Sequence, residues 1–225
     1  MNQVPAFQNF DAIIFDMDGV LIDSEPLWKI AMKKVFSSLG SRLTKKDFQK
    51  TVGLRLDEVI HFWNHHENWN LPDERAIENA IIDALIELIL AHPYPLPGVI
   101  ETLRFLKNNN VKIGLATSSS NRLITCVLNA LGIQDFFDVV HSAEHEAYGK
   151  PHPAVYLHVA QQLQVRPMHC LVIEDSFNGV IAGIAAQMQV CCIPELSHEP
   201  NPRLAVANYH FDSMSALLQA WQAQH

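Results

Sequence analysis

A short apolar run that ends in two aspartates constrains this chain more than any other stretch. Residues 12–15 read Ala-Ile-Ile-Phe, a composition typical of a β-strand buried on both faces of a sheet. Asp16 and Asp18 follow directly, and Gly19 comes next. Two carboxylates so close together at the end of a buried strand repel each other, and burying them is costly unless a cation meets them. A divalent cation would remove that cost.

This acidic pair fits two interpretations. In the chemical one, Asp16 is a nucleophile that attacks phosphorus. Asp18 then protonates the leaving oxygen and later deprotonates the attacking water, while Gly19 lets the backbone approach a ligand closely. In the structural one, the run is a strand followed by an Asp-Gly turn of the kind found in hairpins. The remainder of the chain has to discriminate between them.

Composition excludes several classes of protein. The chain has 225 residues, 48% of them hydrophobic, which is enough for one large domain or for a domain with a smaller insert. A formal net charge of −8 argues against a nucleic-acid partner. The four cysteines form no C-x-x-C pair and no dense disulfide framework, which fits a reducing compartment.

No segment predicts a membrane span or a signal peptide. The first ten residues lack a basic region followed by a long apolar one. The longest apolar-rich segment, residues 76–91, is interrupted by Glu78, Asp83 and Glu87, which is typical of an amphipathic helix in a soluble protein. We therefore expect a cytoplasmic protein without a membrane partner.

After the first strand, the pattern changes to helices. Helical spacing of apolar residues, with capping residues at the ends, predicts helices over residues 26–39, 45–50, 57–66 and 74–91. Nothing in this section reads as a buried strand, so we expect residues 23–95 to form a helical domain. Three prolines and a glycine within residues 93–98 mark its end and are a candidate hinge.

Helices and strands alternate from residue 99 onward. The expected strands cover residues 111–116, 137–141, 169–173 and 189–193, and the expected helices cover residues 99–109, 122–131, 153–163, 178–186 and 213–221. This alternation predicts an α/β core of residues 1–22 and 96–225, with a Rossmann-like parallel sheet covered by helices on both faces. In such sheets, ligands bind at the carboxyl ends of the strands.

Polar groups follow the later strands too, and each has two interpretations. Thr117 and Ser118 could hold a phosphate through hydroxyl and amide groups, or could cap the next helix. Lys150 could neutralise phosphate charge, or could be an ordinary surface lysine. Glu174 and Asp175 could bind a hard cation such as Mg²⁺, or Asp175 or Ser176 could cap the next helix. Jointly, these groups supply the parts that phosphoryl transfer needs.

Four segments carry a family resemblance. Residues 15–25 (FDMDGVLIDSE), 116–118 (ATS), 149–151 (GKP) and 173–176 (IEDS) resemble, in order and spacing, the four motifs of the haloacid dehalogenase-like hydrolase superfamily. The match extends over nearly the whole chain, and the helical insert is similar to that family's helical cap of the first type. Within the family, the chain most resembles sugar-phosphate phosphatases of the 2-deoxyglucose-6-phosphate and hexitol-phosphate type.

The resemblance implies a role for each motif. Asp16 corresponds to the nucleophile and Asp18 to the general acid/base. Thr117 and the amide of Ser118 correspond to the groups that hold the transferring phosphoryl group. Lys150 corresponds to the cation that balances its charge.

The resemblance also implies a cofactor, Mg²⁺. The Asp16 carboxylate, the Asp18 backbone carbonyl and Asp175 would bind the ion. Glu174 would help to hold metal-bound water.

Family members place a loop of the cap over the site, which implies that Gly53, Leu54 and Arg55 face the substrate. Arg55 could pair with a polar or anionic part of the substrate, or could be a solvated charge at a helix start. Asn121 is also expected to face the substrate.

The sequence therefore predicts a Mg²⁺-dependent phosphatase that acts through an aspartyl-phosphate intermediate. The expected substrates are small sugar phosphates, namely hexose 6-phosphates such as 2-deoxyglucose 6-phosphate, and hexitol phosphates. We expect a monomer with a small phosphorylated sugar or sugar alcohol as its partner, and no nucleic acid.

Other functions on the same fold are disfavoured by particular residues. Mutases of the β-phosphoglucomutase type carry a histidine twelve residues beyond the nucleophile, where this chain has Trp28. A dehalogenase has no need of the second acid, Asp18. A non-catalytic phosphate-binding regulator could lose Asp16 or Asp18 without penalty, and both are present.

Neither the tryptophans of the cap nor the histidines predict a further functional site. Trp28 and Trp63 are expected in the core of the cap rather than as platforms on which a sugar packs. His61 and His65 are four residues apart on a predicted helix, but no third ligand is evident near them, so no zinc site is expected there. His141, His145 and His152 are near the lysine motif in sequence and receive no role.

Overall fold

A six-stranded parallel sheet forms the centre of the computed structural model, which describes residues 4–51, 54–194 and 201–224. Its strand order is β3-β2-β1-β4-β5-β6. The strands are β1 (Ala12–Phe15), β2 (Lys112–Thr117), β3 (Val139–Ser142), β4 (Cys170–Glu174), β5 (Gln189–Cys192) and β6 (Tyr209–His210). All residues of β1 and β4 are buried, as predicted for strands covered on both faces.

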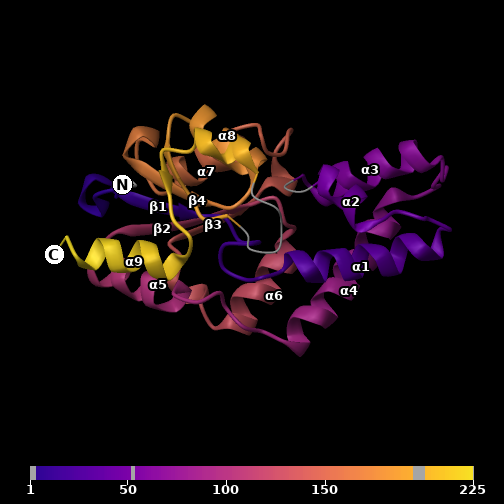
Figure 1. Ribbon diagram of the computed structural model, residues 1–225, viewed down its shortest axis with the longest axis horizontal. Coiled ribbons are helices and arrows are strands. Elements are labelled where there is room, and N and C mark those ends of the chain that lie inside the picture. The colour runs from indigo at the N-terminus through magenta and orange to yellow at the C-terminus, as the bar shows by residue number, and fades with distance from the viewer. Residues whose placement is uncertain (1–3, 52–53, 195–200, 225) are drawn as a thin grey trace.

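Helices cover both faces of this sheet (Figure 1). One face is covered by α5 (Val99–Asn108), α6 (Asn121–Leu131) and α9 (Met214–Gln222), and the other by α7 (Ala154–Gln162) and α8 (Phe177–Ala185). Alternate residues of β1 point into two separate apolar clusters. Ile13 and Phe15 pack on the α5 side, whereas Ala12 and Ile14 pack on the α7 side.

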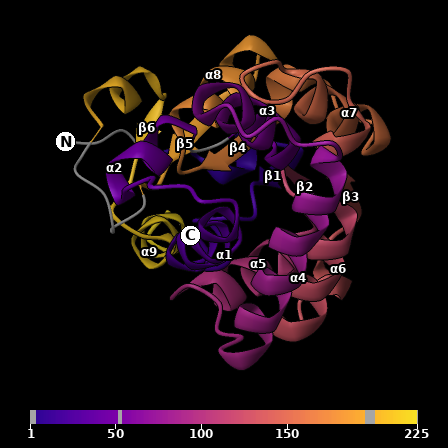
Figure 2. The same cartoon turned by 90° about the vertical axis from the view of Figure 1, so that its right-hand side faces the viewer.

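The remaining four helices form the cap, which lies beyond one end of the sheet (Figures 1 and 2). They are α1 (Glu25–Ser38), α2 (Lys45–Phe48), α3 (Leu56–Glu67) and α4 (Glu74–Ala91), and both α1 and α3 pack on α4. Asp73 begins α4 as an N-cap, because its side chain accepts hydrogen bonds from the amides of Arg75 and Ala76. Trp63 is fully buried in the cap, as predicted.

The predicted fold class is confirmed: an α/β core with an inserted helical cap. The cap boundaries at residues 23 and 95 stay a prediction. The chain leaves the core after β1 and returns before α5, and the isolated bridge between Ile22 and Pro95 joins these two crossings. Among the described residues, no helix combines the length and the apolar character needed to cross a membrane.

Some predicted elements differ from the structure at their ends. The expected strand over residues 137–141 is β3 at residues 139–142, and a 3-10 turn at residues 134–136 precedes it. The expected helix over residues 45–50 is α2 followed by a second such turn. Strand β6 was not predicted, since two residues are too few to show an alternating pattern.

Candidate active site

The acidic residues after β1 lie at the point where the sheet changes direction. The chain places β2 on one side of β1 and β4 on the other, so the connections that leave these strands diverge and form a crevice. Phe15 pairs with Leu115 and with Ile173, which brings Asp16 level with Ala116 and Glu174. The neighbours of β1 are both parallel, so the interpretation of this segment as a hairpin turn is wrong.

A buried ion cluster is the centre of the site. The Lys150 ammonium donates hydrogen bonds to Asp16 Oδ1 at 2.7 Å, to Glu174 Oε1 at 2.7 Å and to the Ala116 carbonyl at 3.2 Å. Only 3% of Lys150 is exposed, so its interpretation as a surface lysine is wrong. The structure brings together three residues that are far apart in the sequence and gives each charge an opposite partner.

Burial and neighbouring charge set the protonation of this cluster. Burial raises the pKa of Asp16 to about 7, and the Lys150 ammonium acts against this rise. Burial disfavours the charged form of Lys150, but the Asp16 and Glu174 carboxylates outweigh it and raise the pKa of the lysine above its ordinary value. Lys150 is therefore a permanent positive charge beside the predicted nucleophile.

Glu174 is held from both sides of its carboxylate. Its Oε1 accepts a hydrogen bond from the Tyr156 hydroxyl at 2.8 Å in addition to the one from Lys150. Its Oε2 accepts from the amides of Asp175 and Ser176 and from the Ser176 hydroxyl. Burial alone would raise the pKa of Glu174. The Lys150 ammonium and the hydrogen-bond donors outweigh burial, so the pKa lies below its ordinary value. Glu174 thus anchors Lys150, and its predicted part in holding metal-bound water stays a prediction.

Gly179 in α8 leaves room for the Glu174 carboxylate. A Cβ atom at Gly179 would lie 1.6 Å from Glu174 Oε1, so any larger residue at the start of α8 would displace the carboxylate. Ser176 caps this helix through a hydrogen bond from the Gly179 amide. The capping interpretation of the IEDS motif is therefore correct for Ser176, whose hydroxyl also contacts Glu174.

Asp18 is held by three donors. Its Oδ1 accepts hydrogen bonds from the Ser24 hydroxyl at 2.5 Å and from the Trp28 indole at 2.9 Å, and its Oδ2 accepts from the Ser119 hydroxyl at 2.6 Å. The sequence analysis did not identify Ser24, Ser119 or Trp28 as partners of Asp18, and it expected Trp28 in the core of the cap. Trp28 occupies the position of the mutase histidine, and this was a signal that its side chain faces the site.

Three carboxylates could hold a divalent cation. Asp16, Glu174 and Asp175 each offer an oxygen, and these oxygens all lie within 4.8 Å of one another. Asp175 also lies close to the backbone of Gly19, since a Cβ there would be 2.2 Å from Asp175 Oδ2. Gly19 has a φ of 72°, a conformation that favours glycine. Oxygen ligands with more negative than positive charge fit a hard cation such as Mg²⁺.

The residues after β2 form the opposite wall. Thr117 is the last residue of β2, and its buried hydroxyl accepts a hydrogen bond from the Ser119 amide at 3.1 Å. Ser118 lines the cavity beside it. Ser120 also lines the cavity, and among the described residues its buried hydroxyl has no hydrogen-bond partner. A buried hydroxyl without a partner is costly, so Ser120 is a candidate contact for a substrate.

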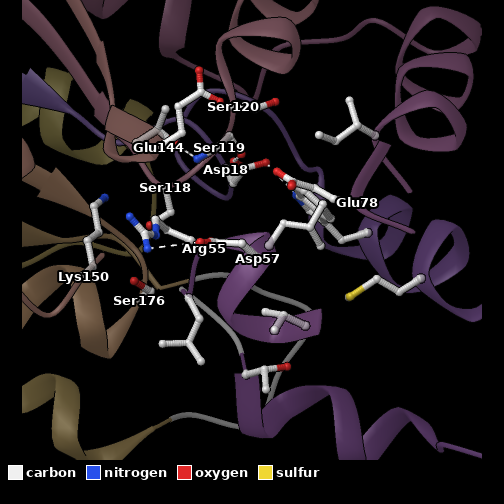
Figure 3. Close-up of a pocket in the computed structure, with 18 of the residues that line it drawn as sticks. Asp18, Arg55, Asp57, Glu78, Ser118, Ser119, Ser120, Glu144, Lys150 and Ser176 are labelled. Carbon is white, nitrogen blue, oxygen red and sulfur yellow. Dashed lines mark hydrogen bonds and ion pairs between the residues drawn. The ribbon is translucent and has the colours of Figure 1, made fainter. Parts of the chain in front are cut away.

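A cavity of about 630 Å³ lies between these strand ends and the cap (Figure 3). Core residues that line it include Asp16, Asp18, Ser118, Lys150 and Asp175. The predicted site residues Thr117 and Arg55 line it as well. Glu174 lies behind Lys150 and is not among the lining residues.

Arg55 connects the cap to the core. It is the N-cap of α3, and its Nη1 donates hydrogen bonds to the carbonyls of Ala143 and Glu146, at 3.1 and 2.7 Å. Its Nη2 forms ion pairs with Asp57 and Glu58. Its side chain is only 13% exposed, so its interpretation as a solvated charge is wrong. Within the described part of the chain, its Nε is buried without a partner.

Three other residues were predicted to face the substrate, namely Asn121, Gly53 and Leu54. The Asn121 amide group pairs with His145 Nε2 at 2.6 Å, and Asn121 is exposed and not among the residues that line the cavity. His145 and Glu144 do line it. Gly53 lies outside the described residues, whereas Leu54 lines the cavity.

Known proteins are similar to this chain in sequence and in fold. The sequence model of the haloacid dehalogenase-like hydrolases matches residues 10–187. Hexitol phosphatase B of Escherichia coli (strain K12) is 39% identical over 207 residues, which cover 92% of this chain and 93% of that protein. A phosphorylated carbohydrates phosphatase of Thermotoga maritima is 33% identical, over 80% of this chain and 82% of that protein. The crystal structure of β-phosphoglucomutase from Clostridium difficile has a TM-score of 0.82 and 28% identity, and covers 96% of this chain and 98% of that one.

Proposed function

Because this chain belongs to the haloacid dehalogenase-like hydrolase family, we propose that it is a Mg²⁺-dependent phosphatase of small sugar and sugar-alcohol phosphates. It is an enzyme of the phosphoric monoester hydrolase class. The observation that carries the proposal is the buried cluster of Asp16, Lys150 and Glu174, which opens onto a cavity under the cap.

In the first half-reaction, Asp16 attacks phosphorus and forms an aspartyl-phosphate. Lys150 stays within hydrogen-bond distance of Asp16 and spreads the negative charge that develops on the phosphoryl oxygens. Glu174 accepts a hydrogen bond from Lys150 and fixes the position of its ammonium. Tyr156 in turn donates a hydrogen bond that orients Glu174. Asp16, Asp175 and the Asp18 carbonyl would hold Mg²⁺, which when bound would supply further positive charge for this step.

Asp18 moves the protons in both half-reactions. Its proton goes first to the leaving alcohol, which leaves Asp18 as a carboxylate. The three donors Ser24, Trp28 and Ser119 hold this side chain in position. The carboxylate then takes a proton from the water that attacks the aspartyl-phosphate, and inorganic phosphate is released.

The walls of the cavity fit an uncharged polyol better than a second anion. Asp57, Glu74, Glu78 and Glu144 line it and offer acceptors to substrate hydroxyl groups. Burial, with added repulsion from Asp57, raises the pKa of Glu78, which indicates that negative charge is already crowded there. Hexose 6-phosphates and hexitol phosphates carry one phosphate and several hydroxyls, which supports their choice as substrates.

A mutase is the second candidate, because the fold closely resembles β-phosphoglucomutase. In this chain the indole of Trp28 donates a hydrogen bond to Asp18. An indole N–H cannot accept a proton as an imidazole can. We therefore assign water, and not a second sugar hydroxyl, as the acceptor of the phosphoryl group.

Release of inorganic phosphate from a substrate panel tests this proposal. The panel holds 2-deoxyglucose 6-phosphate, other hexose 6-phosphates, hexitol phosphates, phosphoglycolate and β-glucose 1-phosphate, each with Mg²⁺ and with a chelator. We expect Mg²⁺-dependent release that is fastest with the hexose or hexitol esters. Conversion of β-glucose 1-phosphate into the 6-phosphate without phosphate release would establish the mutase instead.

A further inference from the structure

A second cluster of metal-binding side chains lies outside the cavity. His141 belongs to β3, Glu146 follows the 3-10 turn Ala143–His145, and His158 belongs to α7. One ligand atom from each residue lies within 4.8 Å of the other two, and all three residues are partly buried. The sequence analysis gave none of them a role.

The two imidazoles converge on one carboxylate oxygen. His141 Nε2 lies 2.6 Å from Glu146 Oε1, and His158 Nδ1 lies 3.3 Å from the same atom. The two rings are stacked, with centroids 3.7 Å apart and planes 12° apart. Such an arrangement gathers two nitrogen ligands and one oxygen ligand without any contribution from the cavity.

We propose that His141, Glu146 and His158 bind a divalent transition-metal ion such as Zn²⁺, at a site separate from the Mg²⁺ site. Two histidines and one carboxylate are a ligand set that Zn²⁺ takes, with a fourth position for water. Bonds of about 2.0–2.1 Å in a tetrahedral site place ligand atoms about 3.3 Å apart, which is the separation between His158 and Glu146.

Ligand chemistry separates this site from the catalytic one. Imidazole suits Zn²⁺, Cu²⁺ and Ni²⁺, whereas Mg²⁺ prefers oxygen ligands. The cluster of Asp16, Glu174 and Asp175 offers only oxygen. Mg²⁺ in excess should therefore fill the oxygen site and leave the histidine site open to a transition ion.

Binding requires a small rearrangement of the cluster. The ion replaces the hydrogen bond between His141 and Glu146, and His141 takes the neutral tautomer whose ring proton is on Nδ1, so that Nε2 is free to bind the ion. The two stacked rings turn so that their nitrogen lone pairs meet at the ion. The His158 side chain is 41% exposed, and this exposure gives an ion access from solvent.

The site has a physical connection to the cap. The carbonyl of Glu146 accepts the 2.7 Å hydrogen bond from Arg55. Glu144 and His145, in the 3-10 turn that precedes Glu146, line the cavity. An ion bound to the Glu146 carboxylate would hold residues 143–146 in place, whose carbonyls accept the hydrogen bonds from Arg55. Occupation of the site is therefore expected to favour the closed cap.

Visible absorption of Co²⁺ tests the proposal without any use of catalysis. Co²⁺ is titrated into metal-free protein in the presence of excess Mg²⁺. We expect one equivalent to give the intense visible bands of a four-coordinate site, and Zn²⁺ to remove them. His158→Gln and Glu146→Gln should each weaken Co²⁺ binding by at least about tenfold.

Two control variants make the result specific. His169→Gln alters a histidine of similar exposure that pairs with Asp11, and it should leave the Co²⁺ spectrum unchanged. Asp175→Asn alters the oxygen site and should also retain the spectrum. Absence of intense bands in the wild-type protein, or bands that persist in both His158→Gln and Glu146→Gln, would overturn the proposal.

Discussion

At the scale of single residues, Lys150 determines the charge balance of the site. Its ammonium lies 2.7 Å from oxygens of both Asp16 and Glu174, and all three side chains are buried. Taking each ion out of water costs several kcal/mol, and mutual attraction offsets this cost only while every partner is present. Removal of the one cation leaves two carboxylates facing each other.

We expect Lys150→Met to lower the free energy of unfolding by about 3–5 kcal/mol in the absence of Mg²⁺. Lys107→Met is the matched control, because Lys107 pairs with Asp138 at 2.6 Å in a partly exposed position. That change should cost about 1 kcal/mol or less. Urea denaturation measures both, and equal small losses would contradict the role of Lys150 as the buried counter-ion.

The raised pKa of Asp16 predicts how Mg²⁺ affinity depends on pH. Burial raises this pKa to about 7, so below that pH a proton occupies the carboxylate that the metal requires. The apparent affinity for Mg²⁺ should be constant above about pH 7 and should fall by up to about tenfold per pH unit below it. Titration calorimetry across this range measures the effect. A constant affinity down to about pH 5.5 would show that Asp16 does not bind the ion.

Several contacts of the site could be predicted from local sequence and several could not. Asp16, Lys150 and Asp175 could be predicted as site residues because each belongs to one of the motifs that occur in a fixed order. Ser24 and Trp28 were missed as partners of Asp18, because their approach depends on how the turn at Gly19 folds the start of α1 back over the site. Such a path is set by tertiary packing and leaves no periodic signal in the sequence.

At the scale of elements, two arginines join the cap to the core. Arg55 at the start of α3 donates to core carbonyls. Arg122 in α6 donates to Asn79 and Asp83 of α4. The Arg55 side chain is 13% exposed, whereas those of Arg122 and Asp83 are 53% and 62% exposed. Only the first contact is shielded from solvent, so it should contribute more to closure.

Arg55→Ala is expected to lower kcat/KM for sugar phosphates by about tenfold or more, mainly through KM, because an open cap leaves the cavity wet. Arg122→Ala removes the other, exposed contact and should change kcat/KM by less than about threefold. Steady-state kinetics on both variants measure the difference. Equal effects would mean that Arg55 is no more than a surface contact.

The elements themselves follow from sequence to different degrees. Buried strands such as β1 and β4 have apolar compositions that identify them without help from the rest of the chain. The choice between a hairpin and a parallel sheet after β1 depended on the later alternation of strands and helices. Strand β6 is defined by its pairing with the edge of β5, and its two residues show no local pattern that predicts a strand.

At the scale of the whole molecule, topology assembles the site. Residues separated by more than a hundred positions, such as Asp18 and Ser119, meet because the carboxyl ends of β1 and β2 share one edge of the sheet. The cap lies beyond this edge, to the right of the sheet in Figure 1, and completes the cavity. The parallel order could be predicted from sequence, whereas the closed position of the cap depends on contacts such as that of Arg55 with Glu146.

The central claim is that Asp16 carries the phosphoryl group, and trapping that intermediate tests it most directly. Enzyme with Mg²⁺ is mixed with a radiolabelled substrate from the panel, quenched in acid during the first turnover and digested. We predict label on the peptide that contains Asp16, and neither label nor turnover in Asp16→Asn, whose rate should fall by at least about a thousandfold. Label on another residue, or phosphate release by Asp16→Asn at the wild-type rate, would contradict the account.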